Sequence, residues 1–297
     1  MSPAAPPSAS LPRVVAWTAV VASTLPEIIW RESGHEYSVW FTAAESLLIL
    51  LPALAAIWIP SLRKVARFLI AVSILNFAWD YIGPTLANLP AVLAVTDKVS
   101  WGQRLFLNRT FTLSGALLVS LTLIGSGITR RDLFLCKGNL SAPAQPIPFL
   151  GLRKPVSWAW LGPAFILVFA LILAPYLYLT VHPNFNGSHR IIRTFPWSLA
   201  VAALNAASEE FQFRSVLLAH LRENFRPAES VLLVATFFGL RHYFGQPSGP
   251  LGVAMAAFAG WIWARSMIDT RGGVWAFLIH MALDIVIFAF LVVGAGM

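Results

Sequence analysis

Long apolar runs separated by short polar stretches extend over most of the chain. A helix that crosses the hydrocarbon core of a bilayer needs about 20 mainly apolar residues. On this scale the sequence predicts membrane segments over residues 14–30, 37–59, 66–88, 105–127, 157–181, 197–220, 229–244, 250–268 and 274–295. Pro26 and Glu27 interrupt the first segment and Pro84 interrupts the third, so the prediction is eight or nine helices. The fold class that follows is all-α, a polytopic transmembrane helical bundle.

The composition agrees with a membrane protein. Hydrophobic residues make up 58% of the 297 residues and charged residues only 11%, whereas soluble domains carry about 25% charged residues. The net charge of +8 comes from short basic clusters between apolar runs. Such clusters are typical of cytoplasmic loops facing anionic lipid headgroups, and no nucleic-acid partner is expected. The single cysteine, Cys136, excludes an internal disulfide and a cysteine-based metal site.

The basic clusters also predict the orientation of the chain. They lie over residues 63–67, 130–154, 222–226 and 265–271. With nine spans all four clusters fall on one side of the membrane together with the N-terminus, and Arg190 and Arg193 are the main exception. Since basic loops concentrate on the cytoplasmic side, the prediction is N-terminus inside and C-terminus outside.

Three parts are expected along the chain. Residues 1–12 are predicted to be a disordered tail because they are rich in Pro, Ala and Ser, and the apolar run that follows is expected to remain as a membrane segment. Residues 13–156 form the front membrane helices and end in a Pro- and Gly-rich connection over 128–156. Residues 157–297 form a helical core that holds all the candidate chemistry. No internal repeat is visible, which disfavours an inverted-repeat transporter.

Two adjacent glutamates, Glu209 and Glu210, lie inside the apolar segment 197–220. A carboxylate near the middle of a bilayer costs roughly 2.5–3.5 kcal/mol on insertion scales, so a polar interior site is the first interpretation. Glu210 and Arg214 are spaced i,i+4 and can form an ion pair on one helix face. Glu209 shares a different face with Asn205, which leaves it available for proton transfer. The competing interpretation is that both glutamates only pair with basic groups to hold helices together.

Two further pairs with the same spacing follow. Phe238 and His242 end the seventh segment, and His280 and Asp284 lie in the ninth. A carboxylate and an imidazole can activate a water, and a second imidazole with a polar partner can stabilise an oxyanion, which together favours hydrolysis. Alternatively, Glu209, His242 and His280 could hold a divalent metal such as zinc, although no His-Glu-x-x-His motif is present.

These three pairs, in this order, resemble the motifs of the CPBP intramembrane proteases. The motifs read Glu209-Glu210-x-x-x-Arg214, Phe238-x-x-x-His242 and His280-x-x-x-Asp284, and the resemblance covers about residues 195–295. The family includes the CAAX prenyl endopeptidases and the bacterial bacteriocin-processing and immunity-type proteins. The resemblance implies a multi-pass protein of the bacterial inner membrane.

The resemblance also implies a role for each residue. Glu209 matches the general base and His242 the group that helps to activate water. His280 and Asp284 match the pair that holds the oxyanion or the geometry of the site, and Glu210 and Arg214 match the supporting acid and base. Asp284 replaces the Asn of the prenyl endopeptidases, which points away from that branch, and Ser215 replaces a common Gly.

The expected function is therefore an intramembrane endopeptidase acting on a membrane-associated protein or peptide. The alternative is a non-catalytic protein, either a proton-coupled transporter or an immunity-type scaffold, because intramembrane ionisable groups also serve proton relays. One geometric difficulty remains at this stage. At about 1.5 Å per helical residue, His242 is expected to lie farther from the basic loops than His280.

Overall fold

The structure is a computed structural model that describes residues 10–183 and 189–294, and it is built almost entirely of helices. Residues 1–9 of the expected tail lie outside the described residues. The first helix begins at Leu11, so the last two residues assigned to the tail are helical.

The front half consists of short helices in sequence. They are α1 (Leu11–Ala22), α2 (Leu25–Glu32), α3 (Val39–Ala55), η1 (Pro60–Lys64), α4 (Ala66–Phe77), η2 (Ala78–Ile82), α5 (Gly83–Ala87), α6 (Pro90–Thr96), α7 (Trp101–Thr110), α8 (Leu113–Ser120) and η3 (Leu121–Leu123). The first predicted segment is divided into α1 and α2. Pro26 lies in the first turn of α2, where its missing N–H costs no helical hydrogen bond, so it starts a new helix.

The back half contains the longer helices. They are α9 (Trp158–Val181), α10 (His189–Glu210), η6 (Phe211–Val216), α11 (Leu217–Leu221), α12 (Pro227–Arg241), α13 (Gly249–Thr270) and α14 (Val274–Gly294). Ser157 caps α9 by accepting a hydrogen bond from the backbone N–H of Ala159. The turn η6 is a π-helical turn that continues α10 into α11.

Five helices of the described residues are long and apolar enough to cross a membrane. They span Ala66–Ala87, Trp101–Leu123, Trp158–Val181, Gly249–Thr270 and Val274–Val293, and Val39–Ala55 is a shorter apolar helix. The all-α membrane bundle is therefore confirmed, whereas the predicted count of eight or nine spans is not. Four predicted segments are not among the five. The segment 14–30 is divided into α1 and α2, and 37–59 contains α3 with only 17 residues. The segment 229–244 contains α12 with only 15 residues, and the α10–α11 helix carries the charged side chains of the predicted site.

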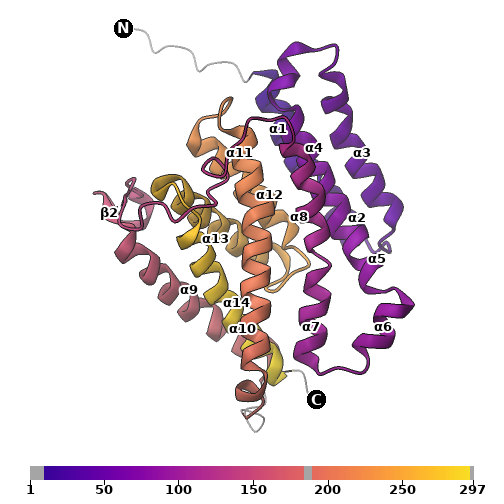
Figure 1. Cartoon of the computed structure of the whole chain (residues 1–297), viewed down its shortest axis with the longest axis vertical. Coiled ribbons are helices and arrows are strands. Elements are labelled where there is room, and N and C mark those ends of the chain that lie inside the picture. The colour runs from indigo at the N-terminus through magenta and orange to yellow at the C-terminus, as the bar shows by residue number, and fades with distance from the viewer. Residues whose placement is uncertain (1–9, 184–188, 295–297) are drawn as a thin grey trace.

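The helices form two groups that pack against each other (Figure 1). In the back group α12 packs on α13, α10 on α14, and α14 on α9. The front group contacts it where α7 meets α10, α8 meets η6, α4 meets α11 and α1 meets α12. Both helices that carry the first two motifs thus lie against the front half.

The four basic clusters gather at one end of the bundle. Arg63, Arg67 and Arg222 line one pocket, and Arg222 also lines a second pocket with Arg131 and Arg271. The loops are tied together by contacts between distant residues, such as the hydrogen bond from Asn224 Nδ2 to the carbonyl of Lys64 at 3.0 Å. The clusters do share one side, as the orientation requires; that this side is cytoplasmic remains a prediction.

The connection over 128–156 contains the one sheet of the described residues, which the sequence pattern did not predict. Strands β1 (Pro143–Ala144) and β2 (Val156–Ser157) pair antiparallel, and η4 (Pro148–Leu150) lies between them. The connection is fixed to the end of α13, where the Asn139 N–H donates to the Thr270 carbonyl at 2.8 Å and the Gln145 N–H donates to Asp269 Oδ2 at 3.4 Å. It thereby covers the end of the bundle at which the basic clusters lie.

Candidate active site

Glu209 and Glu210 end α10 immediately before the π-helical turn η6. Both are buried, with 5% and 4% of their surface exposed, and Arg214 is fully buried at 0%. Arg214 NH1 lies 3.0 Å from Glu210 Oε1, so the predicted i,i+4 ion pair is present. A π-helical turn is rare and often marks a functional site, because the extra residue per turn re-aims the neighbouring side chains.

Aromatic rings surround the Arg214 guanidinium. Its central carbon lies 3.7 Å from the Phe238 ring centroid and 4.7 Å from that of Trp263. A Cβ at position 260 would lie 3.1 Å from Arg214 NH2, so Gly260 leaves the room that this guanidinium occupies. Cation–π attraction is strong when the cation is desolvated, and it compensates part of the cost of burying Arg214.

His280 on α14 lies among three carboxylates, those of Glu209, Glu210 and Asp284. Its Nδ1 lies 2.7 Å from Glu210 Oε1, and its Nε2 lies 3.7 Å from both Glu209 Oε2 and Asp284 Oδ2. A carboxylate only accepts, so Nδ1 is the donor to Glu210 and the tautomer of His280 is fixed. The imidazole is stacked on Trp263 at a centroid distance of 4.2 Å and an interplanar angle of 8°.

The hydrogen-bond partner of Asn205 lies on another helix. The sequence placed it on the same helix face as Glu209, but its Nδ2 donates to Asp284 Oδ2 at 3.0 Å, across to α14. This hydrogen bond orients the carboxylate that approaches His280. Asn205 therefore contacts the His280–Asp284 pair, a contact between helices that the shared face with Glu209 did not predict.

His242 follows the last residue of α12. Its Nδ1 lies 2.8 Å from the Phe238 carbonyl oxygen, and the two rings are 4.1 Å apart. The carbonyl is an acceptor, so Nδ1 carries the proton in this hydrogen bond and Nε2 keeps its lone pair. His242 thus has a nitrogen that can accept a proton from water.

A cavity of about 140 Å³ brings the two histidines together. His242, His280 and Asp284 line it, and most of the remaining wall is apolar, with residues from α9, α12, α13 and α14: Phe169, Ile172, Leu173, Phe238, Met255, Ala256, Phe258, Ala259, Trp263, Leu283 and Ile287. The expected difference in depth between His242 and His280 does not separate them. Both side chains line the same cavity.

The structure gives no support to the predicted metal-ligand set. Within residues 10–183 and 189–294, no group of three or more His, Cys, Asp or Glu side chains has a spacing that could hold a metal ion. The zinc site of Glu209, His242 and His280 stays a prediction. The Glu209 Oε2 atom lacks a hydrogen-bond partner among the described residues, so it is available as an acceptor.

Trp263 is a site residue that sequence reasoning did not assign. It lies against both Arg214 and His280, and Phe238 is 5.6 Å from it between ring centroids. A tryptophan in an apolar helix resembles many others in the chain, so its position beside an arginine and a histidine could not be recognised from spacing.

Comparison with known proteins finds a protease family that resembles the part of the chain holding the site. The family model described as type II CAAX prenyl endopeptidase Rce1-like matches residues 191–286. This segment resembles a CAAX protease. The CAAX-protease-like segment (residues 191–286) covers about a third of the chain and contains every predicted site residue, whereas the front half lies outside it. The match confirms the resemblance drawn from the three motifs. No curated protein and no solved structure matches the chain.

Proposed function

We propose that this protein is an intramembrane endopeptidase that hydrolyses a peptide bond of a membrane-associated protein or peptide. The observation that carries the proposal is the meeting of all three motifs around one buried group, in which His280 contacts Glu209, Glu210 and Asp284 beside the cavity lined by His242. The similarity of residues 191–286 to a protease family supports hydrolysis at the level of reaction class.

In this mechanism Glu209 is the general base. Its Oε2 is buried and has no hydrogen-bond partner among the described residues, so it can accept a proton from water. Nε2 of His242 can accept a hydrogen bond from the same water because its Nδ1 is committed to Phe238. The hydroxide equivalent attacks the peptide carbonyl carbon, and the proton passes from the base to the departing amine.

His280 stabilises the oxyanion that forms. Since Nδ1–H is committed to Glu210, donation from Nε2 requires the imidazolium form. Three carboxylates, those of Glu209, Glu210 and Asp284, lie near one guanidinium, that of Arg214, and an imidazolium at His280 offsets part of the excess negative charge. Asp284 then orients His280 rather than donating itself, which accommodates an Asp where the prenyl endopeptidases have Asn.

The test compares chain termini of membrane proteins from cells that carry wild-type protein or the Glu209→Gln variant at equal abundance. Glu229→Gln is the matched control, because Glu229 lies on α12 outside the site and pairs with Arg13. New termini with wild type and the control, but not with Glu209→Gln, are expected. Identical termini in all three would contradict proteolysis, and a substrate flux that collapses with the pH gradient would instead establish the proton-coupled transporter.

A further inference from the structure

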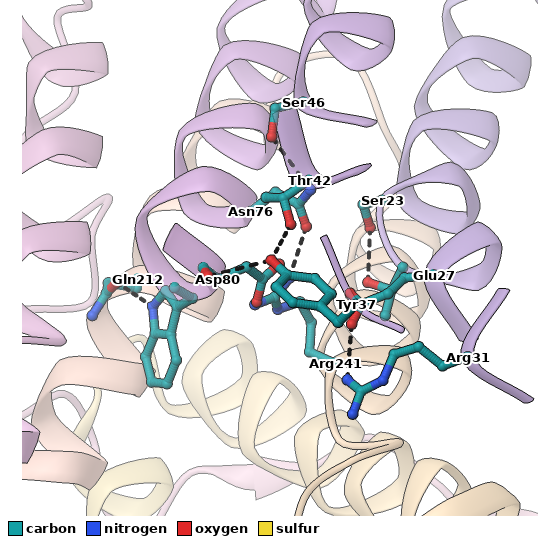
Figure 2. Close-up of polar contacts among 12 residues, drawn as sticks. Ser23, Glu27, Arg31, Tyr37, Thr42, Ser46, Asn76, Asp80, Gln212 and Arg241 are labelled. Atoms are coloured by element: carbon teal, nitrogen blue, oxygen red, sulfur yellow. Dashed lines mark hydrogen bonds and ion pairs between the residues drawn. The ribbon is translucent and has the colours of Figure 1, made fainter. Parts of the chain in front are cut away.

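The front half contains a second buried polar cluster, to which no motif was assigned (Figure 2). Glu27 and Glu45 are 6% and 3% exposed, and the Glu27 N–H donates to Glu45 Oε1 at 3.2 Å. Asp80 lies beside them in η2, and the back half contributes Arg241 from the end of α12. Ionisable side chains inside a membrane bundle are costly, so their retention calls for a role.

Arg241 is held by a bidentate pair with Asp80. Its NH1 and NH2 donate to the two carboxylate oxygens of Asp80 at 2.8 and 2.5 Å, and NH1 also donates to Asn76 Oδ1 at 2.7 Å. The side chains of Arg241 and Asp80 are only 9% and 19% exposed. Because parallel charge-assisted hydrogen bonds fix both distance and orientation, this contact locks the end of α12 to the front half.

The residue after Arg241 is His242. Arg241 closes α12 and His242 is its C-terminal cap, with its backbone N–H donating to the Gly239 carbonyl at 2.9 Å. The last turn of a helix lacks some of its carbonyl partners and frays easily unless another contact holds it. The Asp80–Arg241 pair supplies that contact one residue away from the imidazole that lines the cavity.

The same turn also holds the helix of the glutamates. Trp79, next to Asp80 in η2, donates from Nε1 to Gln212 Oε1 at 2.8 Å. Gln212 lies in η6, two residues after Glu210. Its Nε2 donates at 2.6 Å to Oγ of Ser208, the residue immediately before Glu209. Thus adjacent residues of η2 contact the two helices that carry Glu209 and His242.

Both ends of the Trp79–Gln212 hydrogen bond lie in π-helical turns. In the part of the chain that the structure describes, the π-helical turns are η2 and η6. A π-helical turn weakens the regular hydrogen-bond ladder and persists where the altered side-chain direction is needed. Within η2, Trp79 contacts Gln212 of η6 and Asp80 contacts Arg241 of α12.

We propose that η2 is a bracket that sets the position of His242 relative to Glu209, with Asp80 and Trp79 as positioning residues. Asp80 acts through Arg241 on the end of α12, and Trp79 acts through Gln212 on the glutamate helix. The role in catalysis rests on the proposed endopeptidase function. The role in fixing the two helices does not, and it can be measured without cleavage.

The first experiment measures how fast diethyl pyrocarbonate modifies each histidine of the full-length protein in detergent, read by mass spectrometry. Asp80→Asn keeps the size of the side chain but removes its charge, so the rate at His242 is expected to rise several-fold. His220, which is hydrogen-bonded to Thr122, serves as the internal reference. The control Glu229→Gln breaks another ion pair between the halves, at the opposite end of α12, and is expected to leave His242 unchanged.

A second variant keeps the proposal testable if Asp80→Asn does not fold. Trp79→Phe removes one N–H but retains a ring against Phe213, whose centroid lies 5.2 Å from that of Trp79. It is expected to raise the modification rate at His242 relative to His220, because η6, which packs on α12, loses its hydrogen bond to η2. An unchanged His242 rate in Asp80→Asn, or an equal rise in Glu229→Gln, would overturn the assignment.

Cleavage provides the second readout. Asp80→Asn is expected to lower kcat by about tenfold to a hundredfold with little change in KM, since small misplacements of a catalytic group have effects of this size. Asp80→Glu, which keeps the charge, is expected to recover part of the loss. If wild type cleaves and Asp80→Asn cleaves equally well, the positioning role fails and the endopeptidase stands. If wild type does not cleave, the proposed function fails, and the modification rates still test whether η2 fixes the positions of the two helices.

Discussion

Two arginine–carboxylate pairs, Arg241–Asp80 in the front cluster and Arg214–Glu210 in the back cluster, are built differently. In the front cluster Asp80 holds Arg241 with two hydrogen bonds and Asn76 adds a third. In the back cluster Arg214 lies close to Glu210, yet its three nitrogens lack a hydrogen-bond partner among the described residues and it rests on aromatic rings. The first pair is saturated and rigid, whereas the second leaves polar atoms available next to a cavity. A satisfied network positions helices, and an unsatisfied one can respond to water and substrate.

The largest expected effect lies at the unsatisfied cluster. Glu209→Gln and His242→Ala are each expected to lower the cleavage rate by about 10²–10⁴-fold, the usual contribution of a general base. Rates on a purified membrane-anchored peptide, at matched concentrations of folded protein, provide the measurement. Normal processing by both variants would mean that the back cluster is structural, like the front one.

The second-largest effect is expected on stability, when the cation of the back cluster, Arg214, is removed. Arg214→Gln leaves Glu210 buried without its ion pair, which costs about 3–5 kcal/mol when a buried pair loses one partner. Thermal unfolding in detergent reports the loss. Arg13→Gln is the control, since Arg13 is partly exposed in its pair with Glu229 and should cost about 1 kcal/mol or less. Equal losses of stability in the two variants would contradict a larger contribution from the buried Arg214–Glu210 pair.

A smaller effect is expected at Gly260. A Cβ there would lie 3.1 Å from Arg214 NH2 and 3.2 Å from Phe238 Cδ1, so Gly260→Ala crowds the guanidinium and its aromatic neighbour. Overpacking of this kind costs about 1–3 kcal/mol. Lower thermal stability together with a lower cleavage rate is the expected result, and unchanged values would show that Arg214 has room to move.

The smallest effect is expected at the basic end of the bundle. Hydrogen bonds from the backbone and hydroxyl of Thr129, followed by the Arg222 guanidinium, lower the pKa of Asp132 to about 2. Because the folded-state pKa lies below the ordinary value, the stabilisation is present at neutral pH and is lost as the pH falls from about 4 toward 2. Asp132→Asn should lower stability by about 1 kcal/mol or less at pH 7 and have no effect at pH 2. Unfolding curves at the two pH values check this, and an equal difference at both would contradict it.

The sequence predicted the contacts that lie within one helix. Glu210 with Arg214, Phe238 with His242, and His280 with Asp284 are all spaced i,i+4, and each pair meets in the structure. Helical periodicity alone brings such residues together. The membrane class was equally predictable, because long apolar runs with few charges are typical of helices that satisfy their backbone hydrogen bonds within the bilayer.

Contacts between helices could not be predicted in this way. Asn205 on α10 donates a hydrogen bond to Asp284 on α14, and Trp263 on α13 stacks on His280 of α14; helical spacing predicted neither contact. The front cluster was missed because Asp80 and Arg241 are isolated charges, 161 residues apart, that share no motif.

The amino-acid sequence by itself determined that this chain forms a helical membrane bundle, and it determined which residues share a helix face. The tertiary structure decided that Glu210 bridges Arg214 and His280, and that η2 holds the helices of Glu209 and His242. The physical reason is that helix periodicity is local, whereas the offset and rotation of one helix against another depend on the packing of all their side chains together.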